Sequence, residues 1–310
     1  MTKLQFETLS NQTVAVCGVF YFLAFLAYLV QWSALRKVSA PVAVSVGGGE
    51  PVAEEPSASD RPAFFGRLGV SFTIVAAVIH LVACVSRGLA ADPVRVPWGN
   101  MYEFTLTATF LVSTVFLLLQ GRWKLDWLGP VVVAFVFVVL MADVLFLYDP
   151  VVSLQDSLQS PWLVIHVIAA VTATAAFTLG GMCSVLFLIK TRWPDTRPGG
   201  FLDRVPDLPT LDRVAYRLHA FGFPVWTFAA LITGPIWAQN AWGRYWGWDP
   251  KEVWAFITWV VYAAYLHARA TAGWKGKAAA IVALIGLATL WFNFIGINFF
   301  FGSGSMHSYA

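Results

Sequence analysis

The sequence carries little charge for its length. Of its 310 residues, 12% are Asp, Glu, Lys or Arg and 58% are hydrophobic, and the mean hydropathy is +0.68. Soluble domains carry about 25% charged residues. The composition therefore excludes an ordinary soluble domain and predicts a membrane protein covered by lipid. The net charge of +3 is too small to indicate a nucleic-acid partner.

Cysteine is also scarce. Cys17, Cys84 and Cys183 all lie inside apolar runs, and none belongs to a C-x-x-C pair. Buried single cysteines usually behave as small apolar side chains. We therefore expect no thiol–disulfide chemistry from this chain itself. The N-terminal residues lack a basic segment and a small-residue cleavage site, so we expect the first apolar run to be retained as a helix.

Long apolar runs dominate what is present. A spanning helix needs about 20 apolar residues. Eight segments come close to or meet this length, at residues 14–35, 68–86, 102–120, 128–147, 162–189, 220–238, 253–269 and 278–301. The sequence predicts an all-α, polytopic membrane bundle of about eight transmembrane helices.

The basic residues are unevenly distributed over the predicted loops. The first, third, fifth and seventh loops hold 15 of the 20 Lys and Arg residues, and the remaining 5 lie on the other side. Because cytoplasmic loops are enriched in Lys and Arg, both termini are expected outside. We divide the chain into residues 1–67, a first helix plus a flexible cytoplasmic linker, and residues 68–310, a membrane domain with a Trp-rich outer loop at 237–252.

This outer loop is the most unusual segment. Residues 237–259 hold six of the fifteen tryptophans. Tryptophan is common at membrane interfaces, so an aromatic belt is one interpretation. Trp242, Trp246, Trp248 and Tyr245 in one short loop are better explained by a platform on which a planar aromatic ligand stacks. The neighbouring Arg244 and Lys251 would then pair with acidic groups of that ligand.

The segment that follows, Asp249-Pro250-Lys251-Glu252, has two interpretations. Asp249 is a good N-cap, Pro250 fits the first helical position, and Glu252 completes a capping box. This pattern favours a helix start over a chemical role. Asp249 nevertheless lies inside the aromatic loop, so we also keep it among the candidate ligand-binding residues.

Four of the five histidines are candidate metal ligands, because ionisable residues in membrane spans mark functional sites by default. His166 lies about 6 Å into its predicted span from the outer side, and His307 follows the last span, also outside. With the Trp loop they would form a bis-imidazole haem site. His80 and His267 form a weaker second pair, with predicted depths that differ by roughly 10 Å. Each of them could instead be a satisfied helix–helix hydrogen bond. We expect His219 to lie at the inner interface.

These residues together resemble a known family. Residues 241–259, AWGRYWGWDPKEVWAFITW, resemble the WWD signature of the CcsA/ResC-type cytochrome c assembly proteins. Residues 161–186, 265–269 and 306–309 resemble that family's histidine segments. Residues 97–103, PWGNMYE, resemble its P-x-S-N-x-Y-E segment, with Gly99 in place of the usual Ser. The resemblance runs from about residue 68 to the end.

The resemblance implies a role in system II cytochrome c biogenesis. Haem b, as a substrate in transit, would be held by His80 and His267 in the membrane and then by His166 and His307 beside the Trp loop. A ResB-type membrane partner would complete a haem-lyase complex that acts on the C-x-x-C-H segment of apocytochrome c. The implied location is the bacterial plasma membrane or an equivalent energy-transducing membrane.

Three other interpretations remain open. A membrane b-type cytochrome would need two histidine pairs stacked across the bilayer, and would not need an outer Trp loop. A solute transporter would show inverted repeats or polar breaks at mid-membrane. A purely structural scaffold would leave the clustered tryptophans and outer histidines unexplained.

Overall fold

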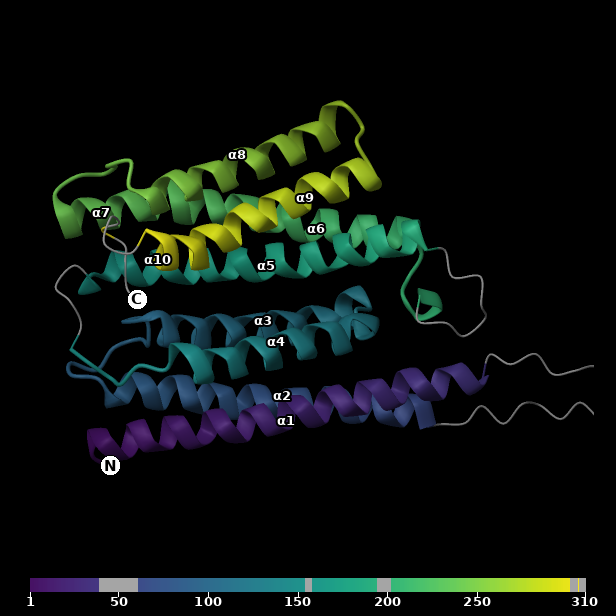
Figure 1. Cartoon of the computed structure of the whole chain (residues 1–310), viewed down its shortest axis with the longest axis horizontal. Coiled ribbons are helices and arrows are strands. Elements are labelled where there is room, and N and C mark those ends of the chain that lie inside the picture. The colour runs from purple at the N-terminus through teal and green to yellow at the C-terminus, as the bar shows by residue number, and fades with distance from the viewer. Residues whose placement is uncertain (39–60, 154–157, 194–201, 302–305, 307–310) are drawn as a thin grey trace, which may run out of the picture.

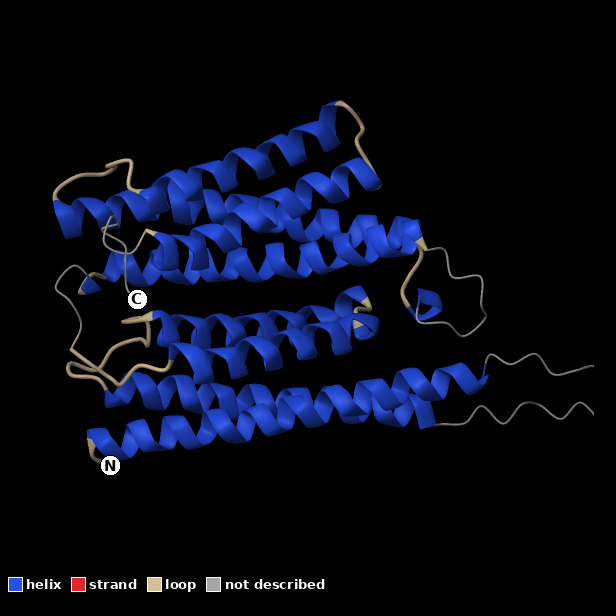
Figure 2. Ribbon diagram, in the orientation of Figure 1, coloured by secondary structure: helices blue, strands red, loops and turns tan. Residues whose placement is uncertain are grey.

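In the computed structural model the chain folds as a bundle of helices that run along one axis (Figures 1 and 2). The structure describes residues 1–38, 61–153, 158–193, 202–301 and 306. Within these ranges every regular element is helical. The predicted all-α fold is thereby confirmed.

The long helices follow the predicted apolar runs, most of them with extra turns at the ends. In chain order the elements are α1 (Lys3–Val38), α2 (Arg61–Ala90), α3 (Met101–Trp123), η1 (Asp126–Leu128), α4 (Gly129–Ala142), η2 (Asp143–Leu147), α5 (Pro161–Arg192), η4 (Leu202–Arg204), α6 (Leu208–Thr227), η5 (Phe228–Thr233), α7 (Gly234–Trp242), α8 (Pro250–Thr271), α9 (Lys277–Trp291), η6 (Phe292–Gly296) and α10 (Ile297–Phe300). Of these, η1 and η4 are 3-10 turns, and η2, η5 and η6 are π-helical.

The bundle has the dimensions and composition of a membrane domain. Seven helical stretches of the described chain are long and apolar enough to cross a bilayer. The more polar α8 has 22 residues and runs antiparallel beside α9 (Figure 1). With α8 included, the chain crosses the bundle eight times. The start of α1, the α7–α8 loop and the end of α10 accordingly lie at the same end.

The helices form two groups that face each other across a seam. The first group is α1 to α4, in which α1 packs along α2 and against α4. The second is α5 to α10, in which α5 packs against α6 and α9, and α8 packs against α9. Contact between the groups runs mainly along α3 and α5. A pocket opens at this seam, at the end that holds the α7–α8 loop.

Side-chain caps fix where the helices at this seam begin. The carboxamide of Asn100 accepts from the Glu103 N–H at the start of α3, and the hydroxyl of Ser160 accepts from the Trp162 N–H at the start of α5. Such caps satisfy backbone donors that have no partner within the helix. They place the first turns of both helices against the pocket.

The sixth span is irregular where the sequence has two prolines. Pro224 lies inside α6 and Pro235 lies in the first turn of α7, and the intervening η5 is π-helical. Proline removes a backbone donor and crowds the preceding turn, which disturbs the regular α-helical register. The wider π-helical turn shifts the carbonyl groups of this span relative to α5. This shift matters for the geometry of the site.

Candidate functional site

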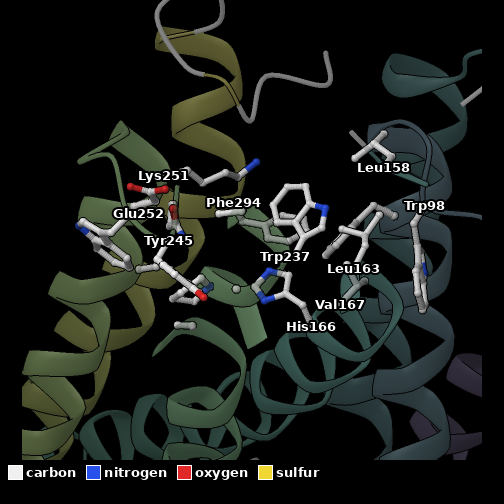
Figure 3. A pocket seen from close by; sticks show the side chains of 18 of the residues that line it. Trp98, Leu158, Leu163, His166, Val167, Trp237, Tyr245, Lys251, Glu252 and Phe294 are labelled. Atoms are coloured by element: carbon white, nitrogen blue, oxygen red, sulfur yellow. The ribbon is translucent and has the colours of Figure 1, made fainter. Parts of the chain in front are cut away.

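The pocket at the seam holds about 1010 Å³ of empty space, part of it open to solvent. Its walls come from α3, α5, α7, the α7–α8 loop, α8 and η6 (Figure 3). Pockets for small molecules and cofactors are mostly apolar, with a few placed polar groups. This pocket has that character, because His166, Lys251 and Glu252 lie among aromatic and apolar side chains, and it suits an organic ligand. Its polar groups decide which kind.

His166 on α5 is the imidazole of this pocket. Its Nδ1 lies 3.0 Å from the carbonyl oxygen of Ala229 in η5. A carbonyl only accepts hydrogen bonds, so Nδ1 carries a proton, and in the neutral imidazole Nε2 then carries the lone pair. A neutral imidazole whose N–H is bound to a backbone carbonyl has the tautomer and the orientation of a metal ligand.

Trp237 on α7 forms the wall beside this histidine. Its indole stacks on the His166 ring, with centroids 5.9 Å apart and planes inclined by 16°. Trp237 is almost fully buried, and it packs with Leu163 and Val167 of α5. Because α7 begins directly after η5, the π-helical segment sets both the hydrogen bond and the ring stack of His166.

The residues of the predicted aromatic platform lie in three different environments in the structure. Trp242 packs inward, edge to face on Trp237, with centroids 4.8 Å apart. Trp246 and Tyr245 line the pocket. Trp248 stands outside it, 70% exposed and in the left-handed backbone region with φ 58°. Trp246 and Tyr245 therefore supply the loop's aromatic surface to the pocket, and Trp248 lies at the rim.

Asp249 has the predicted helix-start role and a second contact. Its Oδ1 accepts from the Lys251 N–H at 3.1 Å, and the Glu252 carboxylate accepts from the Asp249 N–H at 3.1 Å, which confirms the capping box. Its Oδ2 accepts from the Met306 N–H at 2.8 Å. Asp249 thus joins the start of α8 to Met306, which follows α10 in the sequence.

The two basic residues of the loop lie in different places. Lys251 lines the pocket, and its Nζ donates to Asn298 Oδ1 at 3.1 Å. Lys251 precedes the predicted span 253–269. Burial lowers the pKa of its amine from 10.5 to about 8, although the nearby Asp249 carboxylate acts to raise it. Arg244 is exposed, and its guanidinium contacts Met306 Sδ at 2.8 Å. Lys251 therefore supplies the positive charge of the wall.

The opposite wall comes from the 97–103 segment at the start of α3. Trp98, Asn100 and Met101 line the pocket. Met101 Sδ also receives a hydrogen bond from Asn298 Nδ2 at 2.7 Å, which links the first helix group to η6 and α10. Sequence reasoning did not assign these residues to the site. The signal that could have found them was the resemblance of their segment to a family motif.

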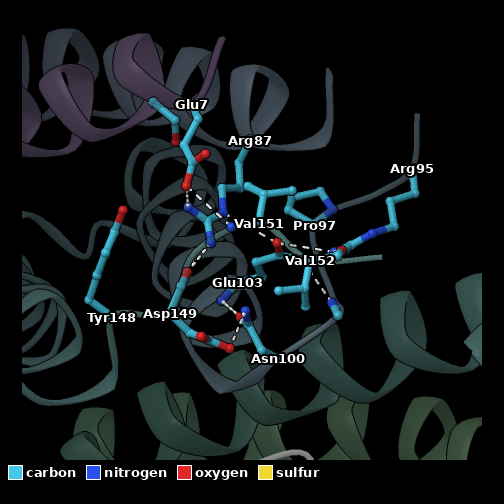
Figure 4. A network of polar contacts seen from close by, with 12 residues as sticks. Glu7, Arg87, Arg95, Pro97, Asn100, Glu103, Tyr148, Asp149, Val151 and Val152 are labelled. Carbon is cyan, nitrogen blue, oxygen red and sulfur yellow. Dashed lines mark hydrogen bonds and ion pairs between the residues drawn. The ribbon is translucent and has the colours of Figure 1, made fainter. Parts of the chain in front are cut away.

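A buried ion-pair network holds this wall in place (Figure 4). The fully buried carboxylate of Glu103 accepts from Arg87 Nε at 3.2 Å, from Arg95, and from the Gly99 N–H at 2.8 Å. Arg87 reaches the carbonyl of Asp149 and lies 3.5 Å from the Glu7 carboxylate. The network therefore ties α1, α2, α3 and the loop after η2 together beside Asn100, which lines the pocket.

The other predicted haem ligands are not gathered in this pocket. His80 on α2 is fully buried, with Nδ1 3.3 Å from the Tyr21 hydroxyl and its ring edge-on to Phe110. His267 lies exposed on α8. Among the described residues no contact joins these two side chains. His307 lies outside the described residues, directly after Met306.

His219, for which the sequence predicts a place at the inner interface, is enclosed by neighbouring helices. Its ring is fully buried among Phe177, Tyr262 and Tyr265, and neither ring nitrogen has a hydrogen-bond partner within the described chain. The predicted span began at residue 220, whereas α6 begins at Leu208. His219 therefore lies three turns inside the helix, about 16 Å from its start.

The chain matches known proteins over most of its length. Residues 98–303 match the family described as "Cytochrome C assembly protein". The chain is 33% identical over 270 residues to the "Cytochrome c biogenesis protein CcsA" of Mesostigma viride, covering 79% of this chain and 86% of that protein. A protein of the same name from Synechococcus sp. (strain JA-2-3B'a(2-13)) is 31% identical over 351 residues, covering 91% and 95%.

The similarity of fold extends to a solved structure. The "Cytochrome c Heme Lyase CcmF" superposes with a TM-score of 0.64 at 15% identity. The match covers 95% of this chain and 47% of that one, so the chain spans about half the length of the lyase. At this identity the likeness concerns the fold alone.

Proposed function

The chain belongs to the cytochrome c assembly protein family, and from that premise we propose that it binds haem in the pocket at the α7–α8 end and presents it for covalent attachment to apocytochrome c. Family membership places the protein in cytochrome c biogenesis. Haem is here the substrate being handled, rather than a resident cofactor. The proposal concerns where this chain holds haem and which of its residues do so.

The observation that carries the proposal is the hydrogen bond from His166 to Ala229. It orients the imidazole, so that the neutral form has its lone pair on Nε2, inside a mostly apolar pocket. Haem iron takes neutral imidazole as an axial ligand. His166 would be one such ligand, and His307 would be the second, since Asp249 holds the preceding residue, Met306, beside the α7–α8 loop.

The remaining pocket residues fit the other features of haem. Trp246, Tyr245 and Trp98 offer aromatic surface to a flat ring. Lys251 offers a charge-assisted hydrogen bond to a carboxylate such as a haem propionate. Trp242 and Trp248 would act less directly, by supporting Trp237 and by forming the rim of the pocket. Haem b has the planar, dianionic and iron-containing structure that this set of groups would recognise.

The chemistry that follows depends mostly on positioning. In the attachment step each thiol of the C-x-x-C-H segment adds across one vinyl group, so that sulfur bonds to one carbon and the thiol proton goes to the other. This addition needs no external oxidant. Holding haem beside a docked peptide makes an encounter in solution a local reaction. The enclosing aromatic wall would keep the ring oriented while the iron is ligated.

We also propose a partner for this chain and an orientation in the membrane. A ResB-type membrane partner would complete the haem lyase, and the Trp-rich loop would face the outer side of an energy-transducing membrane. The inner pair of His80 and His267 stays a prediction. It would require α2 and α8 to approach each other, or each histidine to be completed by another group.

The test is the visible spectrum of the protein purified in mild detergent, oxidised and reduced, before and after haem is added. Wild type should give a low-spin haem spectrum that His166→Ala and His307→Ala each weaken, whereas His80→Ala leaves it intact. Loss of the spectrum in His80→Ala with no change in His166→Ala would instead indicate a membrane b-type cytochrome. Absence of haem in wild type even after haem is added would overturn the proposal.

A further inference from the structure

A second cavity lies at the opposite end of the bundle, where α6 begins and α8 ends. It holds about 880 Å³ of empty space, part of it open, between α5, α6, α8 and the turn before α9. Its walls include Phe187 of α5, Leu208 and Tyr216 of α6, and Lys275 of the turn. This is the end that carries most of the Lys and Arg residues. Nothing in the proposed haem site uses this cavity.

Positive charge prevails in this cavity. Arg213, Arg269 and Lys275 line it together with one acid, Asp212, so three cations and one anion give a net charge of +2. Arg213 and Lys275 are exposed at the mouth. An anionic group that enters the cavity would therefore meet two positively charged side chains.

The floor of the cavity is rigidly built. Arg269 donates to Asp212 Oδ1 at 2.6 Å and lies over the Tyr216 ring, 4.7 Å from its centroid. The Asp212 carboxylate also accepts from the Gly276 N–H at 3.1 Å, which holds the α8–α9 turn against α6. The Arg269 side chain is only 9% exposed. Its position is thus fixed before any ligand arrives, which lowers the entropy cost of binding.

The cavity also has an apolar side. Phe187 of α5 and Tyr216 of α6 supply this surface, and Tyr216 lies about one turn further into α6 than Arg213. A ligand with an anionic head and an apolar body fits this division, and basic pockets between helices on the cytoplasmic side of membrane proteins bind acidic lipid head groups. We propose that this cavity binds the phosphate of an anionic phospholipid from the leaflet on the Lys- and Arg-rich side.

The test compares lipids retained by the purified full chain. Wild type would be exchanged into detergent containing phosphatidylglycerol or phosphatidylcholine, and bound lipid counted by native mass spectrometry. The variant is Arg213→Gln with Lys275→Gln. The matched control is Arg67→Gln with Arg122→Gln, which removes two exposed charges at the same end but outside the cavity. Each basic contact near an anionic surface changes binding by about fivefold, so the cavity variant should retain phosphatidylglycerol roughly 10- to 30-fold more weakly.

The expected result is that wild type and control retain phosphatidylglycerol in preference to phosphatidylcholine, and that the cavity variant does not. Equal loss in both double variants would show a general charge effect and overturn the proposal. Complete displacement of the lipid by millimolar inorganic phosphate would assign the cavity to free anions and also overturn it. Visible spectra of the same samples separate this test from the haem proposal, because the variants leave the outer pocket unchanged.

Discussion

The imidazole of His166 and the backbone carbonyl of Ala229 form a 3.0 Å hydrogen bond between α5 and the π-helical segment of the sixth span. A histidine at this depth could have turned either nitrogen toward the pocket. The hydrogen bond selects one tautomer of His166, and the Trp237 indole stacked on the imidazole selects one orientation of the ring. The pocket therefore contains a ligand-ready imidazole whose geometry is set by a proline-flanked irregularity in the neighbouring helix.

Chemical rescue should reveal this hydrogen bond directly. In His166→Gly, added imidazole should restore the low-spin haem spectrum, because it can ligate iron and still donate to the Ala229 carbonyl. 1-Methylimidazole cannot donate, and a neutral hydrogen bond is worth about 0.5–1.5 kcal/mol. It should therefore require a roughly two- to tenfold higher concentration, measured by titration of the Soret band.

4-Methylimidazole is the control for size, since it carries the extra methyl group and keeps an N–H. It should restore the spectrum about as well as imidazole. Equal rescue by all three compounds would show that the Ala229 contact does not orient the ligand.

The pH dependence of haem binding should follow Lys251. Its pKa in the haem-free protein is about 8, because burial disfavours the charged amine. Below that pH the amine is protonated and can pair with a propionate, so haem affinity should fall as the pH rises above about 8. The stability of the haem-free protein should change with pH in the opposite direction. The free energy of unfolding should rise with pH between about 8 and the ordinary value of 10.5, because the unfolded chain holds its proton longer.

Two variants make this assignment specific. Lys251→Arg keeps its charge at every pH in the range, so its haem affinity should stay level. Lys251→Met should bind haem more weakly at pH 7 and should lose the pH dependence. A fall in affinity that persists unchanged in Lys251→Met would assign the titration to another group.

Local sequence patterns predicted much of the fold. The apolar runs gave all the spans, because a bilayer forces each crossing to satisfy its own backbone hydrogen bonds. The capping box at Asp249 was predictable because all its parts lie within four consecutive residues. Helix α6 begins at Leu208, twelve residues before the predicted span at 220–238, and these added turns carry Asp212 and Arg213. Asp212 is accommodated by Arg269, which lies far away in the sequence.

The site was less predictable than the fold, because its main contacts join residues that lie far apart in the sequence. His166 and the Trp loop were recognisable from residue type and position. The bond to Ala229 was not, since it depends on the π-helical register between Pro224 and Pro235. The contribution of α3 to the pocket depends on a network between residues that lie on four segments of the chain. Burial of His219 depends on Phe177, Tyr262 and Tyr265, which lie on other helices and could not be assigned to it from local patterns.

Glu103 should be the most sensitive residue of the α3 wall. Glu103→Gln removes the negative charge between Arg87 and Arg95 and leaves the fully buried Arg87 short of a partner. Breaking a buried pair in this way costs about 3–5 kcal/mol. Thermal unfolding in detergent should therefore occur at a clearly lower temperature, and haem affinity should fall because Asn100 and Met101 line the pocket. The control variant Lys3→Gln breaks the exposed ion pair with Asp92. It should leave the unfolding temperature and the haem affinity nearly unchanged. Similar behaviour of the two variants would contradict the role of the network.

Any larger side chain in place of Gly180 on α5 should destabilise the protein, because the His219 ring occupies the adjacent space. A Cβ atom at residue 180 would lie 2.6 Å from His219 Cε1 and 2.9 Å from Nε2. The imidazole has no space to retreat, since Phe177, Tyr262 and Tyr265 enclose its other faces. Gly180→Ala should lower the free energy of unfolding by about 1–3 kcal/mol, as expected for overpacking, measured by thermal unfolding in detergent.

The compensating change identifies the cause. His219→Ala alone should destabilise the protein by opening a cavity, whereas adding it to Gly180→Ala should remove the clash, so the double variant should be more stable than the sum of the two losses predicts. Gly121→Ala is the matched control, because no atom lies within 4 Å of its added Cβ and alanine favours the helix by up to about 1 kcal/mol. Strict additivity of Gly180→Ala and His219→Ala would mean that the two side chains do not compete for one space. The close packing of α5 on α6 would then rest on other contacts, and the burial of His219 would be incidental to it.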